Sequence, residues 1–428
     1  MHIFFSGIGG TAIGPLALLA SEAGHTVSGS DKQDSSYVAY LRKQGIANIH
    51  IGQSAQQLAT VHDETPIDWY VYSSAVAIEN PNMPEFVFCR EHAIRMSKRD
   101  ELLNEIISQK NLKLIAIAGT HGKTTTTAMA VWLCQQIGLP ISYTLAAKTS
   151  FAEMAHHPHD ANYFVYECDE YDRNFLHFYP HVSLITGIDW DHPDIFPTRK
   201  EYVEAFEAFV QQSSHSYLWS SDALQLSTVP NSKVTILQEQ SDHIGSIALA
   251  GEVNRRNAWQ VASAMHHIAK RPVSELLKLL EKFPGVSRRF ERIADGLYTD
   301  YAHTPPKIRG ALQLGHEIAG ENLVVVYEGL HNTRQHFISD ELIHLFDTVK
   351  HLYIVPSYLA REDESLDLLT PEKLRDRLST EAQEKTTASQ LDTILKESIK
   401  RHIEDGDTVV CLSAGGGDSL DEWLRRHF

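Results

Sequence analysis

The chain has 428 residues, of which 22% are charged and 43% apolar, a composition typical of a globular protein with about three domains. The formal net charge of -17 at pH 7 argues against a nucleic-acid partner held by phosphate contacts. The four cysteines form no C-x-x-C pair, so neither a zinc knuckle nor a disulfide framework is indicated, and a reducing cytoplasmic location is expected. No apolar run reaches roughly 18 residues, and no membrane insertion is expected.

The N-terminal segment predicts a strand, a glycine loop at residues 7–10, a helix to about residue 22 and a second strand ending at Asp31. The loop and the acid about 20 residues later satisfy the dinucleotide fingerprint G-x-G-x-x-[GA]. This pattern predicts a Rossmann-like unit that presents a helix N-terminus to a phosphate and an acid to a sugar or base, without selecting NAD. A further strand is expected at residues 70–72 and ends in a small polar turn. Ligands of open α/β sheets usually bind at such carboxyl ends of strands. The candidate ligand-binding residues are Gly7, Ile8, Gly9, Gly10, Ser30, Asp31, Ser73, Ser74 and Ala75.

The composition changes after an amphipathic helix centred on residues 101–107, and the first domain is expected to span residues 1–108. An apolar run from Leu114 to Ala118 then predicts a buried strand that delivers a glycine loop to a helix. The loop is Gly119, Thr120, His121, Gly122, Lys123, Thr124 and Thr125.

This loop is a shortened form of the phosphate-binding pattern, because Ile117 stands where the general pattern has its first glycine. Backbone N–H groups of such a loop point at an anion. Lys123 can reach the outer phosphates, and the Thr124 hydroxyl is placed to ligate magnesium. The sequence therefore predicts a nucleoside triphosphate site.

Acidic residues follow the next strand. Residues 163–167 form an apolar run that ends in Glu167, and a carboxylate at a strand end beside a phosphate loop is the usual second ligand of magnesium. The strand expected at 182–186 leads to Asp191 and His192, which form either a metal ligand or an exposed polar loop. Residues 211–247 carry no clean motif, and minor strands and loops are expected there.

A helix is expected from residue 251 to about 268, with Asn254 and Asn257 on one face. Two carboxamides can pair with adenine, although helix capping explains Asn254 equally well. Residues 283–290 read as a linker, so that the central domain spans 109–287 and the C-terminal domain 288–428. Beyond the linker, strands at 297–300, 323–327, 351–355 and 408–412 alternate with helices and predict another open, mostly parallel sheet.

Seven features occur in one fixed order over most of the chain: the phosphate loop, Glu167, Asp191-His192, the Asn254/Asn257 pair, Arg289, Asp300-Tyr301-Ala302-His303 and Arg334. In this order they resemble the Mur ligase family, the ADP-forming amide ligases of peptidoglycan assembly. The N-terminal Gly-Ile-Gly-Gly loop further resembles the alanine-adding branch of that family. The resemblance implies an α/β fold of three domains: an N-terminal Rossmann-like domain for the UDP-sugar, a central P-loop ATPase and a C-terminal Rossmann-like domain for the amino acid.

The resemblance also implies the reaction and the roles of the residues. ATP and Mg²⁺ would be the cofactors, and UDP-N-acetylmuramate and L-alanine would be joined through an acyl phosphate by a monomer or weak homodimer. Lys123, Glu167, His192, His303 and Arg334 would be catalytic, with Thr124, Glu167 and His192 holding metal. Asn254, Asn257, Arg289 and Asp300 would bind ATP with the phosphate loop.

The chain departs from the family pattern at Gly187, Val253 and Thr304, where family members usually have asparagine, histidine and histidine. Several relatives carry a carbamylated lysine after the metal histidine, whereas residues 205–210 contain none, in agreement with the alanine-adding branch. Two alternatives stay open. One is a sister ligase that reuses a recycled peptide, which residues 170–172 also resemble. The other is a dinucleotide-binding module or dehydrogenase with a regulatory ATP site.

Overall fold

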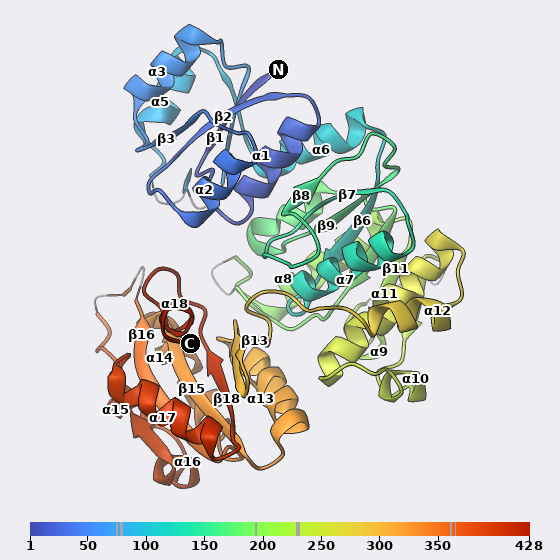
Figure 1. Cartoon of the computed structure of the whole chain (residues 1–428). Coiled ribbons are helices and arrows are strands. Elements are labelled where there is room, and N and C mark those ends of the chain that lie inside the picture. Colours follow the sequence, from blue (N-terminus) through green and yellow to red (C-terminus); the bar gives the residue numbers. More distant parts are fainter. Residues whose placement is uncertain (74–75, 78–79, 193–194, 228–231, 360–361, 364) are drawn as a thin grey trace. The chain divides into compact units, whose positions relative to one another are not determined.

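The computed structural model describes residues 1–73, 76–77, 80–192, 195–227, 232–359, 362–363 and 365–428, and it contains three sheets (Figure 1). The chain divides into two compact units by its internal contacts: Met1–Asp242 with Asn257–Pro284, and His243–Arg256 with Gly285–Phe428. The first unit holds the N-terminal and central sheets, and the second holds the C-terminal sheet. The predicted three-domain α/β fold with mostly parallel sheets is confirmed. The exact domain limits remain a prediction, because the contacts separate only two units.

The N-terminal sheet is entirely parallel, with the order β3-β2-β1-β4-β5. The strand order reverses between β1 and β4, which are both buried. In open α/β sheets, ligands usually bind in the crevice at the carboxyl ends of the two strands where the order reverses. Its elements are β1 (His2–Ser6), α1 (Ile13–Glu22), β2 (Thr26–Asp31), α2 (Ser36–Lys43), β3 (Ile49–Ile51), α3 (Ala55–Glu64), β4 (Trp69–Tyr72), α5 (Pro84–Glu91), β5 (Arg95–Lys98) and α6 (Arg99–Gln109).

The central sheet has the order β12-β11-β10-β6-β9-β7-β8, and only the β7–β8 pair is antiparallel. The strand before the phosphate loop lies between the strands that end at Glu167 and before Thr186, so the three predicted loops share one edge of the sheet. The elements are β6 (Lys113–Ala118), α7 (Lys123–Gln136), β7 (Ile141–Thr144), β8 (Ala155–His156), β9 (Tyr163–Glu167), the 3-10 segment η1 (Tyr171–His177), β10 (Val182–Ile185), α8 (Arg199–Gln212), β11 (Ser216–Trp219), α9 (Ser220–Ala223), β12 (Val234–Leu237), α10 (Asp242–Gly245), α11 (Glu252–Ala269) and α12 (Val273–Leu280).

The segment at 211–247, in which only minor strands and loops were expected, contributes two strands to this sheet. β11 and β12 pair in parallel with each other, and β11 pairs with β10. All four residues of β11 are buried, so this segment belongs to the core of the unit. Its serine-rich sequence concealed that role, because three of the four buried β11 residues are polar or aromatic and show no apolar–polar alternation.

The C-terminal sheet has the order β13-β14-β18-β15-β16-β17 and is parallel except at the β13 edge. Separate apolar clusters cover its two faces, which explains why its central strands are continuous runs of Val, Leu and Ile. The elements are β13 (Glu291–Ala294), β14 (Leu297–Asp300), α13 (Pro305–Ala319), β15 (Leu323–Leu330), α14 (Asn332–Leu342), β16 (His351–Tyr358), α15 (Pro371–Arg375), α16 (Thr380–Glu384), β17 (Thr386–Ala388), α17 (Thr393–Glu404), β18 (Thr408–Leu412) and α18 (Leu420–His427).

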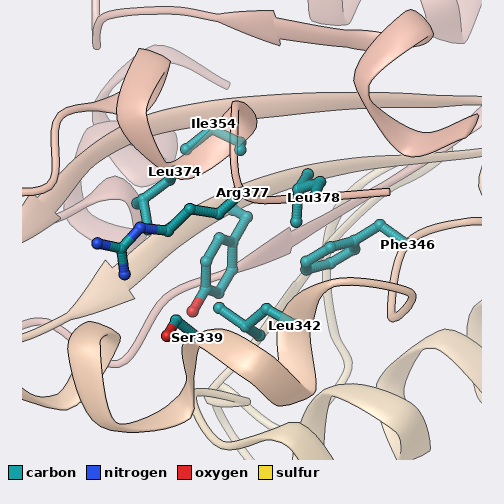
Figure 2. Close-up of a pocket in the computed structure, with 8 residues that line it drawn as sticks. Ser339, Leu342, Phe346, Ile354, Leu374, Arg377 and Leu378 are labelled. Atoms are coloured by element: carbon teal, nitrogen blue, oxygen red, sulfur yellow. The ribbon is translucent and has the colours of Figure 1, made fainter. Parts of the chain in front are cut away.

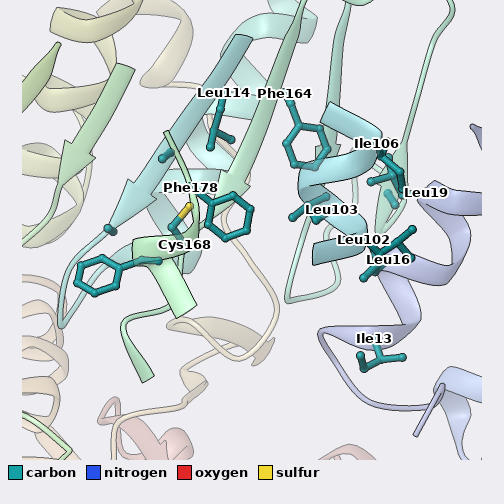
Figure 3. Close-up of a cluster of buried hydrophobic side chains, with 14 of the residues drawn as sticks. Ile13, Leu16, Leu19, Leu102, Leu103, Ile106, Leu114, Phe164, Cys168 and Phe178 are labelled. Carbon is teal, nitrogen blue, oxygen red and sulfur yellow. The ribbon is translucent and has the colours of Figure 1, made fainter. Parts of the chain in front are cut away.

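A continuous apolar cluster joins the N-terminal and central sheets within the first unit (Figure 3). Leu16 and Leu19 of α1 face Leu102 and Ile106 of α6, and Phe164 of β9 lies beside α6. Burial of such side chains contributes about 25 cal/mol per Å² of apolar area. The cluster therefore explains why the two sheets form one compact unit.

All four cysteines are buried and unpaired, in agreement with the absence of a disulfide framework in the sequence. No helix among the described residues is long and apolar enough to cross a membrane. A small, mainly apolar pocket lies in the second unit against β15 and β16 (Figure 2). Its lining contains no predicted site residue and consists of Tyr327, Ser339, Leu342, Phe346, Ile354, Leu374, Arg377 and Leu378.

Candidate active site

The phosphate loop connects β6 directly to α7. Ile117 is fully buried inside β6, where it pairs with Leu184 of β10 and Glu167 of β9. The position that would hold the first glycine of the general pattern is therefore a strand position, which explains why an apolar residue occupies it. The turn itself begins at Gly119, with a φ of +136°, and ends at Gly122, with a φ of +76°.

Gly119 is required by space as well as by its backbone angle. A Cβ atom on Gly119 would lie 2.5 Å from Thr186 Oγ1 and 3.0 Å from the Gly187 nitrogen. The next residue, Thr120, donates its amide to Gly187 O at 2.9 Å and its hydroxyl to Asp189 O at 2.7 Å. The loop after β10 therefore packs directly on the phosphate loop.

Lys123 begins α7 and lies against a buried acid. Its Nζ donates to Gly119 O at 2.6 Å and to Glu170 Oε2 at 2.6 Å. Burial favours a lower pKa for Lys123, but the charges of Glu170, Asp169 and Glu167 outweigh burial and raise it. Burial likewise favours a higher pKa for Glu170, and Lys123 and His192 outweigh it and lower the pKa. Lys123 is therefore a charged lysine held by a carboxylate.

Glu170 lies at this site although no role was predicted for it. It lies three residues after the predicted metal ligand Glu167. Asp169 and Asp172 flank it, and the sequence does not distinguish the three acids. Its side chain is 1% exposed, which distinguishes it from the partly exposed Asp169 and Asp172 nearby. The available signal was its distance of three residues from the strand end, and this signal does not separate Glu170 from its neighbours.

The two predicted oxygen ligands meet at this loop. Thr124 Oγ1 donates to Glu167 Oε1 at 3.2 Å. This contact follows from the parallel pairing of β6 and β9, because the strand-end carboxylate lies beside the first turn of the helix that follows β6. The arrangement agrees with the expected pairing of a phosphate-loop hydroxyl with a strand-end acid.

His192 lies on the other side of Glu170. Its Nε2 is 3.6 Å from Glu170 Oε1 and 3.9 Å from Asp191 Oδ2. Its φ of +57° is unusual for a non-glycine residue, and its amide donates to Asp191 Oδ1 at 2.8 Å. Burial favours a lower pKa for His192, but the neighbouring Glu170 and Asp191 carboxylates outweigh it and raise the pKa. His192 is thus a partly buried residue that lies beside Glu170 and Asp191, and it is not an isolated polar loop residue.

No three side chains of His, Cys, Asp or Glu gather as a ready metal site in the described ranges of the chain. The structure thus brings Thr124 to Glu167 and His192 to Glu170, without a closed cage of protein ligands. Magnesium in phosphoryl-transfer sites is held by one or two protein groups together with the phosphates, so such a cage is not needed.

The helix α11 carries both predicted carboxamides, and the division between the two compact units falls between them. In the first unit, Asn257 borders the phosphate loop: a Cβ atom on Gly122 would lie 3.2 Å from Asn257 Oδ1. In the second unit, Asn254 Nδ2 donates to Ala250 O at 2.9 Å.

The N-terminal glycine loop is organised by the acid that was expected to meet a ligand. Asp31 Oδ2 accepts from the Gly9 amide at 2.8 Å, and Ser30 O accepts from Gly7 at 2.8 Å and from Ile8 at 3.0 Å. The acid at the end of β2 therefore orders the loop itself. Gly10 closes the turn, because its backbone N–H donates a hydrogen bond to Gly7 O at 2.9 Å.

The polar turn after β4 was the second part of this predicted site. Ser73 directly follows β4, the strand beside β1, and its hydroxyl accepts from the Val76 amide at 3.3 Å. Ser74 and Ala75 lie outside the described residues.

In the second unit, the predicted residues Arg289, Asp300 and His303 lie before β13, at the end of β14 and after β14, respectively. Asp300 ends the strand and accepts from the Phe290 amide at 2.7 Å, and burial raises its pKa to about 6. The Arg289 guanidinium lies 5.0 Å from the ring centre of Tyr301. His303 Nδ1 donates to Tyr301 O at 2.9 Å, and burial followed by the Lys307 charge holds the His303 pKa well below its usual range. His303 is therefore neutral, with Nε2 as its acceptor.

Two further residues hold the loops at this edge of the C-terminal sheet, and the sequence did not indicate either. Glu328 is buried near the end of β15 and accepts from Ser413 Oγ at 2.6 Å and from the Leu420 amide at 2.9 Å. Arg288 donates to Ser413 O at 3.0 Å and Gly415 O at 2.9 Å. Arg334 lies at the same edge, in the first turn of α14 after β15.

Three α/β domains with a phosphate loop on the central sheet and an acid-bound lysine define a multidomain enzyme of nucleotide-dependent group transfer. Comparison with known proteins specifies this class. The family model "Mur ligase family, catalytic domain" matches residues 2–111, "Mur ligase middle domain" matches 117–243, and "Mur ligase, glutamate ligase domain" matches 288–415. The chain belongs to the Mur ligase family, and it is an ATP-dependent ligase.

Individual relatives agree with this family. The UDP-N-acetylmuramate--L-alanine ligase of Nocardioides sp. is 28% identical, over 97% of this chain and 93% of the relative. The crystal structure of the UDP-N-acetylmuramate-alanine ligase from Thermotoga maritima has a TM-score of 0.76 at 22% identity, covering 100% of this chain and 98% of that one. A murein peptide ligase from Psychrobacter arcticus has a TM-score of 0.63 at 21% identity, covering 99% of both chains. The two structures support the fold.

Proposed function

We propose that this ligase joins L-alanine to the carboxylate of UDP-N-acetylmuramate through an acyl phosphate, with formation of ADP and phosphate, in peptidoglycan synthesis. The observation that carries the proposal is the cluster at the end of β6 and β9, where Lys123 is bound to buried Glu170 and Thr124 meets Glu167 at 3.2 Å. The names of relatives that align over nearly the whole chain support the substrates.

The proposed chemistry has two steps. An oxygen of the muramoyl carboxylate attacks the γ-phosphorus of ATP, and ADP leaves. The amine nitrogen then attacks the acyl carbon and gives up a proton to a base, the acyl C–O bond breaks, and phosphate leaves as the amide forms. A carboxylate is a poor electrophile until it is phosphorylated, so the first step is necessary. Lys123 would neutralise charge on the transferred phosphoryl group.

The residues at the phosphate loop fit magnesium. Two ligands at adjacent corners of an octahedral Mg²⁺ site lie about 3 Å apart, and the Thr124 hydroxyl and Glu167 carboxylate meet at a similar distance. We infer that these two oxygens hold one ion and that His192 faces a second. A bound Mg²⁺ supplies charge neutralisation at the phosphates.

The remaining predicted residues would bind the other parts of the substrates. Asn257 beside Gly122, and Asn254, Arg289 and Asp300 in the second unit, are proposed for the nucleotide. Arg334 is proposed to bind the carboxylate of the amino acid, since a guanidinium can bind a carboxylate through two parallel hydrogen bonds. The neutral His303 ring can accept a hydrogen bond from the incoming amine at Nε2. The glycine loop at residues 7–10, with Ser30, Asp31 and Ser73, is proposed for the UDP-sugar.

The proposed enzyme acts in the cytoplasm as a monomer or weak homodimer, on small-molecule substrates and without nucleic acid. Its negative charge fits the absence of a nucleic-acid partner.

Mass spectrometry of the products tests this function. The enzyme is incubated with ATP, Mg²⁺, UDP-N-acetylmuramate and a mixture of amino acids and muropeptides. We expect the mass of UDP-N-acetylmuramoyl-alanine together with ADP.

The sister ligase that adds a recycled peptide is the second candidate. Its supporting observation is His331, which stands where alanine-adding ligases usually have a second arginine, so that Arg334 is the only arginine in residues 329–334. Higher kcat/KM with a tripeptide than with alanine would select this candidate instead.

A further inference from the structure

The first turn of α14 is held by a carboxylate from a distant part of the chain. Glu362 Oε2 accepts from the Thr333 amide at 2.9 Å and from the Thr333 hydroxyl at 3.3 Å. Glu362 Oε1 lies 3.6 Å from His331 Nδ1. Asp363 fastens the same turn through its backbone, because its amide donates to Thr333 Oγ1 at 2.9 Å. Residues after β16 thus contact the beginning of α14 at several atoms.

The local sequence explains why α14 needs this outside carboxylate. The first N–H groups of a helix have no partners within the helix, and a side-chain oxygen of the N-cap residue usually accepts one of them. Here the N-cap is His331, whose φ is +56° and whose side chain does not supply the cap bond. Glu362, 29 residues after Thr333, supplies it instead. Its negative charge also lies at the positive end of the helix dipole.

Arg334 directly follows the turn that Glu362 holds. Its charge acts on His303, whose pKa is lowered first by burial, then by Lys307 and also by Arg334. The Arg334 charge also lowers the pKa of Tyr327 in β15, although burial raises this pKa overall. The guanidinium therefore belongs to the edge of the C-terminal sheet where His303 lies, and its position depends on how the first turn of α14 is oriented.

We propose that Glu362 is a positioning residue for the amino substrate: by holding Thr333 and His331 it orients Arg334, which binds the substrate carboxylate. The proposal rests on the proposed function. A bidentate pair between arginine and carboxylate depends on the direction of the guanidinium plane. A change in the orientation of Arg334 would therefore weaken amine binding more than ATP binding. His331 cannot replace Arg334, because an imidazole lacks the planar pair of donors with which a guanidinium binds a carboxylate.

Steady-state kinetics of the whole enzyme test this proposal. The amine is varied at saturating ATP and UDP-sugar, and ATP is varied in a second series. We expect Glu362→Ala to raise the KM for alanine at least tenfold while the KM for ATP changes less than twofold. Glu362→Gln keeps an oxygen for the Thr333 amide and loses the charge that faces His331, so its KM should lie between those of the wild type and the alanine variant.

The matched control is Asp363→Asn, which removes the adjacent carboxylate. The Asp363 side chain accepts from the Ser365 amide at 2.9 Å and its hydroxyl at 2.6 Å, so this variant should retain the wild-type KM for alanine. Thermal unfolding of all three variants reports whether the second unit is folded. If Glu362→Ala does not fold, the comparison of Glu362→Gln with the wild type decides.

An unchanged KM for alanine in folded Glu362→Ala overturns the proposal, as does a fall in kcat alone. Failure of the proposed function gives a different result, because the wild type then forms no alanine product. In that case the same kinetic series is run with the amine identified by mass spectrometry, and the expected rise in its KM is the same.

Discussion

Lys123 and Glu170 form the most deeply buried charged pair at the proposed phosphoryl-transfer site, with side-chain exposures of 13% and 1%. Removing one partner of a buried ion pair leaves an uncompensated charge, which costs more than the pair contributes. The pair also holds the lysine at Gly119 O, inside the phosphate loop. Glu170 therefore orders the residue that meets the phosphates, and both side chains depend on each other.

The substitution Lys123→Ala should abolish turnover and leave UDP-sugar binding nearly unchanged. The lysine acts on charge at the transferred phosphoryl group, whereas the proposed sugar site lies on the N-terminal sheet. We expect kcat to fall by far more than tenfold. A tenfold fall alone corresponds to about 1.4 kcal/mol of activation free energy. Single-turnover kinetics and calorimetry with UDP-sugar measure the two effects. A variant that keeps more than about a tenth of wild-type kcat would contradict the assigned role.

The residues that the sequence could not assign have partners far away in the chain. Lys123 and Thr124 were predictable because their roles belong to one short pattern. Glu170 pairs with a lysine 47 residues earlier, and Glu362 with a threonine 29 residues earlier. Neither spacing corresponds to a local motif, so only the fold reveals these contacts. Asp31 was found by its spacing, but its bond to Gly9 was not.

Among the elements, the turn between β6 and α7 has little freedom. Gly119 and Gly138 both have positive φ, at +136° and +68°. They differ in space: the Cβ position of Gly119 is blocked by Thr186, whereas no atom lies within 4 Å of the Cβ position of Gly138. The two glycines therefore separate backbone strain from steric overlap.

Gly119→Ala should inactivate the enzyme, because the added methyl group displaces the loop after β10 from the phosphate loop. Gly138→Ala is the control. Its added methyl group meets no atom, so its stability should fall only by the cost of a left-handed backbone, about 1–2 kcal/mol. ATPase-coupled turnover and melting temperature measure both. Comparable activity in the two variants would mean that the close approach to Thr186 is unimportant.

The helix α8 bears on the carbamylated lysine that some relatives carry. Its only lysine is Lys200, whose side chain is 84% exposed and pairs with Glu204 at 3.6 Å. An exposed lysine at the start of the helix does not lie in the cluster of Lys123, Glu167, Glu170 and His192.

We therefore expect activity to be independent of bicarbonate. Enzyme that has been acidified and degassed to remove CO₂ is assayed with and without added bicarbonate at constant ionic strength. Rates within about 20% of each other fit the expectation, with chloride as the matched anion control. Specific reactivation by bicarbonate, lost in Lys200→Arg, would show that this lysine is modified after all.

Element prediction succeeded where a run of apolar or β-branched residues ends at an acid or at a polar loop. The strands at 163–167, 297–300 and 408–412 have the predicted limits. The prediction failed to recognise the importance of β11 and β12, because the serine-rich sequence around these strands shows no clear periodicity.

At the scale of the whole molecule, three sheets place their functional loops at the carboxyl ends of parallel strands. This rule, together with the order of seven motifs, allowed the three-domain fold and the family to be predicted from sequence. It could not predict that the chain divides into two compact units, because that division depends on the apolar cluster of α1, α6 and β9.

The N-terminal domain should bind a UDP-sugar and not NAD. In dinucleotide-binding proteins with this fingerprint, the acid at the end of the second strand accepts a ribose hydroxyl. Here the Asp31 carboxylate already accepts from Gly9 at 2.8 Å and from the Gln33 amide at 3.2 Å, so both of its oxygens order the protein. The Asp31 carboxylate and the amides of residues 7–10 therefore all form hydrogen bonds within the protein.

Isothermal titration calorimetry of the wild type with UDP-N-acetylmuramate and with NAD decides between the two ligands. We expect saturable heat with the UDP-sugar alone. Asp31→Asn should weaken its binding about tenfold, or roughly 1.4 kcal/mol, because the Gly9 amide loses a charged acceptor. Asp34→Asn is the control, since Asp34 is 60% exposed and pairs with Arg42. Saturable NAD binding without affinity for the UDP-sugar would favour the dinucleotide-binding interpretation, because the N-terminal domain would then recognise a different nucleotide.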